Sequence, residues 1–416
     1  MREDWIQSTI VESCGIHDNL RKPINSKERN ERISGKKAEE LFPYYGATGQ
    51  VGYIDDYLTD GDFVLVGEDA APFLDYSKDV AYKISGKTWV NNHAHILKSK
   101  FNDDFLLHYL NNFNFNGYVS GTTRLKLTQG KLKQIPIVLP SLVEQKAIVK
   151  KIEELFSSLD SGIADLKKAQ DQLVVYRQAV LKKAFEGEYE IKKLGVVAEV
   201  KRGKSKHRPR NDKSLFGGKY PFIQTGEIRA TNGGTITKYK YTYSEKGLAQ
   251  SKLWPKGTLC LTIAANIGET AFLGFDACFP DSVVGILPNE ELLNSKYLNF
   301  YIQKIKEEMD SKASATAQKN INVRILNALE IPIPSLKEQH QIVSDIESRL
   351  SVCDTVEKDI ADSLEKAQAL RQSILKKAFE GKLLTEEEIA ACKADKDYEP
   401  ASVLLEKIKK EKLKKK

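Results

Sequence analysis

The chain has 416 residues, so we expect two or more domains rather than a single core. Its 41% hydrophobic and 29% charged residues are typical of a soluble globular protein, and no apolar run is long enough to span a bilayer. The acidic N-terminal stretch argues against export. Five scattered cysteines without metal-ligand spacing indicate a reducing cytoplasm and no structural zinc. The net charge of +7 favours a polyanionic partner without identifying one.

The first segment, residues 1–140, is predicted to be an α+β domain of short strands and helices. Clusters of Gly and Asp separate β-branched runs such as 63–66, which is the pattern of short strands. Residues 103–112 are predicted to form a short amphipathic helix. A basic stretch at 20–37 and a polar segment at 121–135 complete the domain.

Residues 141–187 are predicted to form one long helix. Apolar residues recur every three or four positions from Ile148 to Ala184, which places them on one stripe. Ser141 is a suitable N-cap with Glu144 as its capping-box partner, and Gly187 is a natural stop. A helix of this length is a rod of roughly 70 Å, too long for its stripe to be buried by the helix alone.

Residues 188–334 are predicted to be a second α+β domain of similar size but different sequence. A strand is expected at 259–263 and an amphipathic helix at 294–305. A second basic loop lies at 200–213, and a polar segment at 315–329 corresponds to 121–135 in the first domain.

Residues 335–381 repeat the long helix. They align without a gap on residues 141–187, with 20 of 47 positions identical, including the ending LKKAFEG. Although ordinary core packing can also explain such stripes, two equal rods between dissimilar domains favour an antiparallel coiled coil that separates the domains, with pseudo-twofold symmetry. Phe185 and Phe379 in the repeated ending are predicted to be structural junctions, with partner contact as the alternative. A charged tail, 382–416, ends the chain.

The basic loops predict contacts with nucleic acid, because Lys and Arg bind phosphates and Arg also reads guanine edges. Solvated surface loops and, for the aromatic residues, core packing are the alternatives. The candidate DNA-binding residues are Arg21, Lys22, Lys27, Arg29, Arg32, Tyr44, Tyr45, Thr122, Arg124, Lys201, Arg202, Lys204, Lys206, Arg208, Arg210, Gln224, Thr225, Thr316, Gln318, Lys319 and Asn320.

Motifs for catalysis are missing from the sequence. The stretch AEVKRGKS at 198–205 ends like a phosphate-binding loop, but Ala198 stands where that signature needs glycine. The adenine-methylating tetrapeptide, a glycine-rich loop for S-adenosylmethionine and a complete nuclease motif are also missing, and no histidine spacing fits a metal site. We therefore predict a binding protein with no catalytic or metal-ligating residues.

The start of each rod, IPIPSLKEQ at 331–339 and IPIVLPSLVEQ at 135–145, and the ending LKKAFEG resemble the specificity (S) subunits of type I restriction-modification systems, the HsdS family. The resemblance covers essentially the whole chain, although the first rod's start differs by two residues from the spacing of the second. Because recognition domains vary widely in that family, no base-contacting residue carries over.

This resemblance implies two target recognition domains, 1–140 and 188–334, each reading one half of a bipartite, asymmetric site on double-stranded DNA. It implies that the two helices, 141–187 and 335–381, set the spacer and dock two methyltransferase (M) subunits. Restriction-translocase (R) subunits would join the complex. The chain itself would bind no cofactor, since S-adenosylmethionine, ATP and Mg serve N6-adenine methylation and DNA cleavage by the partners.

Other functions remain open at this point. The chain fits a DNA-bridging coiled-coil scaffold without sequence selectivity, or the specificity subunit of a system whose methyltransferase and nuclease are fused. A fused enzyme is disfavoured by the missing motifs.

Overall fold

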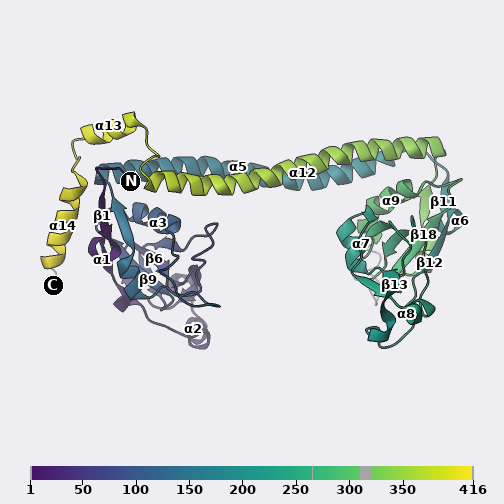
Figure 1. The fold of residues 1–416 in the computed structure, drawn as a ribbon, viewed down its shortest axis with the longest axis horizontal. Helices are drawn as coiled ribbons and strands as arrows, with labels where there is room; N and C mark the ends of the chain where they lie inside the picture. Colours follow the sequence, from purple (N-terminus) through teal and green to yellow (C-terminus); the bar gives the residue numbers. More distant parts are fainter. Residues whose placement is uncertain (1, 265, 310–320, 415–416) are drawn as a thin grey trace. The chain divides into compact units, whose positions relative to one another are not determined.

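The computed structural model describes residues 2–264, 266–309 and 321–414 (Figure 1). The chain forms two compact units, Met1–Leu166 with Ala361–Lys416, and Lys167–Ile360. Each unit contains one α+β domain and parts of both long helices. None of the helices in the described residues is both long and apolar enough to cross a membrane.

The domain of the first unit alternates short strands with short helices. Its elements are β1 (Ile6–Thr9), α1 (Ile10–Ser13), β2 (Cys14–Ile16), α2 (Ser26–Ile33), β3 (Phe42–Gly46), β4 (Gly49–Ile54), β5 (Thr59–Asp60), β6 (Phe63–Gly67), β7 (Ala81–Ile84), β8 (Lys87–Val90), β9 (Ala94–Ser99), α3 (Asp103–Asn112), α4 (Gln129–Gln134) and β10 (Pro136–Leu139).

The domain of the second unit has a similar order of elements. They are β11 (Ile191–Lys193), α6 (Leu194–Val197), β12 (Ala198–Arg202), β13 (Phe216–Phe222), α7 (Thr225–Thr231), β14 (Thr235–Ile236), β15 (Tyr241–Tyr243), α8 (Glu245–Ala249), β16 (Leu259–Thr262), β17 (Thr270–Leu273), β18 (Val283–Pro288), α9 (Ser295–Lys304), α11 (Val323–Asn327) and β19 (Glu330–Pro332). The long helices are α5 (Leu142–Ala184) and α12 (Leu336–Phe379), and the tail forms α13 (Glu386–Ala394) and α14 (Ala401–Lys414).

Both domains contain the same sheet, which we call the frame. Its strand order is β2-β9-β6-β7 in the first domain and β12-β18-β16-β17 in the second, where β14 adds a further strand. Its central strands are buried: Val64 pairs with Leu97 and Leu261 with Val284, and all four side chains are inaccessible to solvent. In each domain, a two-stranded ribbon, β1-β10 or β11-β19, leads to the start of a long helix.

The two domains differ chiefly in the segment between the edge strand of the frame and its central strand. We call these segments insert 1 (residues 17–62, between β2 and β6) and insert 2 (residues 203–258, between β12 and β16). Insert 1 contributes α2 and three strands of a second sheet, ordered β4-β3-β8-β5, whereas insert 2 contributes the β13-β15 pair, α7, α8 and β14.

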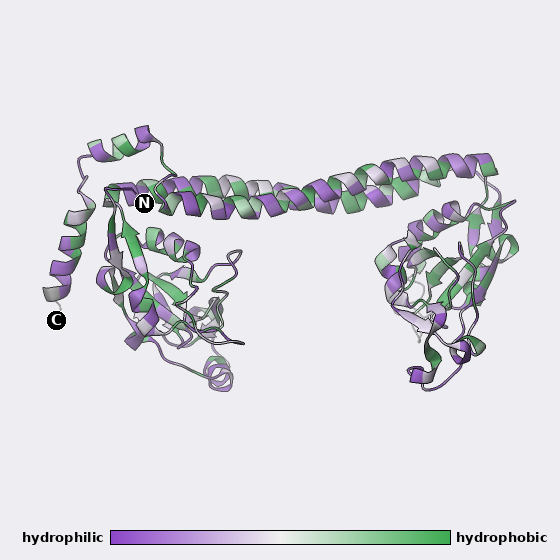
Figure 2. Ribbon diagram, in the orientation of Figure 1, coloured by the Kyte–Doolittle hydropathy of each residue, from purple (hydrophilic) through white to green (hydrophobic). Residues whose placement is uncertain are grey.

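Helices α5 and α12 pack together in an antiparallel pair, as predicted. In the second unit Arg177 forms ion pairs with Asp354 (2.6 Å) and Glu357 (2.9 Å), and in the first unit Arg371 pairs with Asp160. The Arg371–Asp160 pair is the 194-residue repeat of the Arg177–Asp354 pair, which an antiparallel pairing of two equal helices requires. Hydrophobic and hydrophilic residues alternate along both helices (Figure 2), consistent with one buried stripe on each.

The helix starts confirm one capping prediction and correct another. Ser335 and Glu338 form the expected reciprocal capping box, with Ser335 N donating to Glu338 Oε2 at 2.9 Å. Ser141 also caps α5, but the carboxylate of Glu144 instead accepts hydrogen bonds from Arg2 (2.7 Å) and Trp5 Nε1 (3.0 Å). The N-terminal segment lies against this helix start and takes the carboxylate away from the cap.

Candidate nucleic-acid interface

Each domain is fixed to the helix pair by a buried glutamine at the start of a long helix. Gln145 accepts from the backbone N–H of Asn102, the N-cap of α3, and donates to Pro140 O. Its repeat, Gln339, accepts from the N–H of Asn294, the N-cap of α9, and donates to the backbone oxygens of Pro334 and Leu292. Both glutamines are inaccessible to solvent, and their bonds to Pro140 O and Pro334 O are fully buried.

The repeated phenylalanine fixes the same helices from the end of the other long helix. Phe379 packs against Phe105 and Tyr109 of α3, with ring centroids 5.2 Å apart in both pairs. Phe185 packs against Tyr297 and Tyr301 of α9 at 5.0 and 5.3 Å. The prediction that these phenylalanines are structural junctions is confirmed.

These anchors leave the inserts at the free end of each domain. Figure 1 shows α3 and α9 next to the long helices, while α2 of insert 1 and α8 of insert 2 lie at the opposite end of their own unit. Both predicted basic stretches begin at the same place in the frame, around the end of its edge strand. The surface available for a large ligand therefore includes the two inserts.

The three arginines of insert 1 are involved in contacts within the domain. Arg21 is paired with Glu68 and Asp18, and Arg32 with Asp55 at 2.6 Å. The Arg29 guanidinium lies over the ring of Tyr44, 5.0 Å from its centroid. Lys22 and Lys27, the other predicted residues of this stretch, are exposed.

The two predicted tyrosines lie in or beside the core of the first domain. Tyr44 is 3% exposed and its hydroxyl donates to Ile24 O, so in this conformation its ring does not face solvent. Tyr45 is half-buried and stacks on Tyr82, with ring centroids 5.8 Å apart. Burial raises the pKa of the Tyr45 hydroxyl.

Thr122 and Arg124 lie in an exposed loop, residues 120–126, closed by paired backbone bonds between Ser120 and Lys126. Arg124 forms an ion pair with Asp69 (2.9 Å), and the same carboxylate oxygen also contacts His93 Nδ1. The loop is therefore held in place by the carboxylate of Asp69, two residues after β6.

A buried histidine supports the base of this loop. His95 is inaccessible to solvent, and its ring nitrogens contact Asp18 Oδ2 at 2.7 Å and Leu127 O at 2.8 Å. Burial raises the pKa of Asp18, but the hydrogen bond and charge of His95, with Gln129 and Arg21, outweigh burial and lower that pKa to about 2.

The predicted cations of insert 2 and of the strand before it are exposed. Lys201 pairs with Glu199 (2.6 Å), Arg210 pairs with Asp281 (2.9 Å), and Arg202 donates to the backbone oxygen of Asp281. Among the described residues, no carboxylate lies within ion-pair distance of the three remaining cations, Lys204, Lys206 and Arg208. Arg208 donates to the backbone oxygens of Ser205 (2.7 Å) and His207 (2.9 Å), whereas the ammonium groups of Lys204 and Lys206 are available to an external anion.

The other predicted residues are less informative. Gln224 is the exposed N-cap of α7 and Thr225 is the first residue of that helix. Thr316, Gln318, Lys319 and Asn320 lie outside the described residues. The candidate DNA contacts therefore stay predictions, and the structure separates exposed cations from those engaged in the fold.

The sequence-based candidates omit several further exposed cations of insert 2. Lys219 lies in β13 and Lys246 in α8, and Lys238 and Lys240 lie between β14 and β15. They are spread along insert 2 rather than clustered in one stretch, so no local motif marks them. A charge count over the whole segment between β12 and β16 would have found them.

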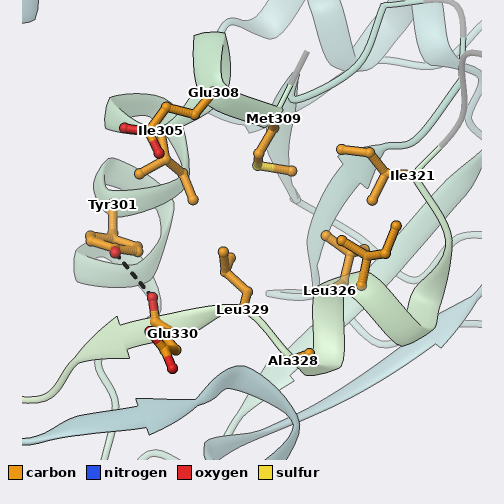
Figure 3. A pocket seen from close by; sticks show the side chains of 10 residues that line it. Tyr301, Ile305, Glu308, Met309, Ile321, Leu326, Ala328, Leu329 and Glu330 are labelled. Carbon is orange, nitrogen blue, oxygen red and sulfur yellow. Dashed lines mark hydrogen bonds between the residues drawn. The ribbon is translucent and has the colours of Figure 1, made fainter. Parts of the chain in front are cut away.

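A pocket of about 450 Å³ in the second domain does not belong to this surface (Figure 3). It lies between α9 and the segment 321–330, and Tyr301 donates to Glu330 O at its edge. Its lining is mostly apolar, and its charged groups are Glu308 and Glu330. A pocket with two carboxylates repels phosphate, and α9 lies at the opposite end of the domain from α8 (Figure 1).

Comparison with known families gives a match in both halves of the chain. The family model described as type I restriction modification DNA specificity domain matches twice, at residues 2–168 and 186–366.

Curated relatives have names of the same kind. The Haemophilus influenzae protein S.HindORF215P, named as a candidate type I restriction enzyme specificity subunit, is 32% identical over 86% of this chain and 91% of its own length. The EcoKI specificity subunit of Escherichia coli is 25% identical over 71% of this chain and 72% of its own length.

Solved structures show the same fold. A chain from a structural study of complex assembly and conformational transition of the type I R-M system superposes with a TM-score of 0.71 at 19% identity, covering 92% of this chain and 99% of that one. The crystal structure of the HsdS subunit from Thermoanaerobacter tengcongensis superposes with a TM-score of 0.59, also at 19% identity, over 92% and 98%.

Proposed function

This chain belongs to the type I restriction-modification DNA specificity family, and on that premise we propose that it reads a bipartite, asymmetric site on double-stranded DNA. Each recognition domain reads one half-site, and the helix pair sets the length of the unread spacer. The chain is non-catalytic in this proposal, and it directs the N6-adenine methylation and ATP-dependent cleavage carried out by its partners.

The observation that carries this proposal is that both domains contain the same frame sheet but different inserts. The common frames are fixed to the helix pair by the same glutamine and phenylalanine contacts, whereas the inserts share neither fold nor sequence. A protein that must present two different reading surfaces at one fixed separation needs this division. Two linked domains also gain affinity through effective concentration when the site spacing matches.

The repeated helices support docking of two identical methyltransferase subunits. An antiparallel pair of equal helices has a pseudo-twofold axis, so each surface of the pair occurs twice, in two equivalent positions. The pairs Arg177–Asp354 and Arg371–Asp160 are related in this way. Restriction-translocase subunits join the same complex. S-adenosylmethionine, ATP and Mg belong to these partners, and the chain itself binds no cofactor.

Footprinting on DNA tests the reading function and separates it from the bridging alternative. We expect the chain, with its methyltransferase partners, to protect two short blocks separated by a constant gap in every bound site. Protection spread evenly along the duplex would instead favour a scaffold that bridges DNA without selectivity.

A further inference from the structure

The positive charge of the chain is concentrated in one insert. Insert 2 contains twelve Lys or Arg against three Asp or Glu, a net charge of +9, which exceeds the +7 of the whole chain. Insert 1, at the same place in the frame, contains seven Lys or Arg against nine Asp or Glu, a net charge of −2. The two domains therefore offer very different electrostatic surfaces to one polyanion.

The charge difference between the two inserts is larger still when only exposed side chains are counted. Eleven of the twelve cations of insert 2 are exposed, and of its three acids only Glu245 is. In insert 1 the three arginines are engaged with Glu68, Asp55 and the Tyr44 ring, which leaves four exposed lysines among seven exposed carboxylates.

Four cations of insert 2, Lys204, Lys206, Lys219 and Lys246, lie on neighbouring elements. The loop of residues 203–215 packs on the region of α8: Ser251 Oγ donates to Lys204 O (2.9 Å), and Lys206 N donates to Gln250 Oε1 (2.6 Å). Lys246 of α8 donates to Ser214 Oγ (2.7 Å), and the pairing of β13 with β15 places Lys219 beside them. These cations thus lie close together in the fold, and two of them have a carboxylate neighbour, Lys219 with Glu245 (3.2 Å) and Lys246 with Asp212 (3.7 Å).

We propose that the two recognition domains divide the work of binding DNA, insert 2 being the electrostatic anchor on the phosphate backbone and insert 1 binding with few ionic contacts. This inference rests on the proposed reading of DNA. Phosphate contacts release counterions, so the anchor dominates the salt dependence of binding, whereas base-edge contacts by a nearly neutral surface depend little on salt.

Two matched triple variants test the proposal. One is Lys204→Gln, Lys206→Gln and Lys213→Gln in insert 2, and the other is Lys27→Gln, Lys36→Gln and Lys37→Gln in insert 1. All six lysines are exposed, and among the described residues no carboxylate lies within ion-pair distance of any of them. Each variant removes the same charge.

The measurement is the dissociation constant of a labelled random-sequence DNA duplex for the full chain, from about 50 to 200 mM salt. A plot of log affinity against log salt has a negative slope. The insert 2 variant should make this slope shallower by up to about 2.7, or about 0.9 for each phosphate that is no longer neutralised. The insert 1 variant should make it shallower by less than about 1. Circular dichroism verifies that both variants are folded.

Equal reductions of the slope, a larger reduction from insert 1, or no reduction from either would overturn the division. If the insert 2 variant does not fold, the triple variant Arg229→Gln, Lys238→Gln and Lys240→Gln replaces it, with the same expectation. Failure of the proposed function would give a different result, because the wild-type chain would then bind its host methylation motif no better than the random duplex. The salt dependence of the two variants would still show whether insert 2 is the electrostatic anchor.

Discussion

Substituting Phe379 by alanine should loosen the first unit and leave the second unchanged. The side chain is 9% exposed and contacts two rings of α3 at 5.2 Å. Replacing a buried Phe by Ala costs about 3–5 kcal/mol, and we expect about 3 because the ring is not fully enclosed. The same amount lowers the hydrogen-exchange protection of α3 amides about a hundredfold, since each 1.4 kcal/mol is a factor of ten.

The repeat offers a matched partner for this experiment. Phe185→Ala should lower protection in α9 by a similar factor and leave α3 unaffected, because Phe185 contacts Tyr297 and Tyr301. Val174→Ala on α5 is the control, since that side chain is 62% exposed. Loss of protection in both domains from either phenylalanine variant would refute the reasoning that each repeated ending anchors one domain.

Three further predictions concern other contacts. Gln339→Ala should destabilise the second unit by about 2–3 kcal/mol in urea unfolding, because it leaves the Asn294 N–H and two backbone oxygens unpaired; a cost below about 0.5 would contradict this. Arg177→Ala and Arg371→Ala should each cost less than about 1 kcal/mol in thermal unfolding, because their carboxylate partners are more than half exposed. The contacts of Asp18 in the folded state lower its pKa from 3.8 to about 2, so they should stabilise the fold by about 2 kcal/mol above pH 4. This stabilisation should be lost as the pH falls from 4 to 2. Asp18→Asn should remove that acid-dependent loss, and an unchanged pH profile would count against it.

The long helices were predictable because their signals are local and repeated. A stripe maintained from Ile148 to Ala184 and a second copy 194 residues later leave few alternatives, and both helices begin and end within three residues of the predicted limits. The helices 103–112 and 294–305 were also found by their periodicity. The altered role of Glu144 was not, because it depends on Arg2 and Trp5, which are distant in sequence.

The candidate interface was harder to predict because exposure is set by tertiary contacts. A run of basic residues in the sequence does not distinguish Arg21, paired with Glu68, from Lys204, which is exposed. Tyr44 was a candidate for DNA binding with core packing as the alternative, and its ring packs in the core under Arg29. The common frame could not be predicted from the sequence either, because the two domains share strand order without sharing sequence.

The most direct test of the reading function is methylation sequencing of host DNA with and without the gene for this chain. We predict that its removal abolishes methylation at one motif, made of two short half-sites around a fixed gap, and leaves all other motifs unchanged. A methylome that contains such a motif and retains it after the gene is removed would contradict the proposal that this chain selects the sites.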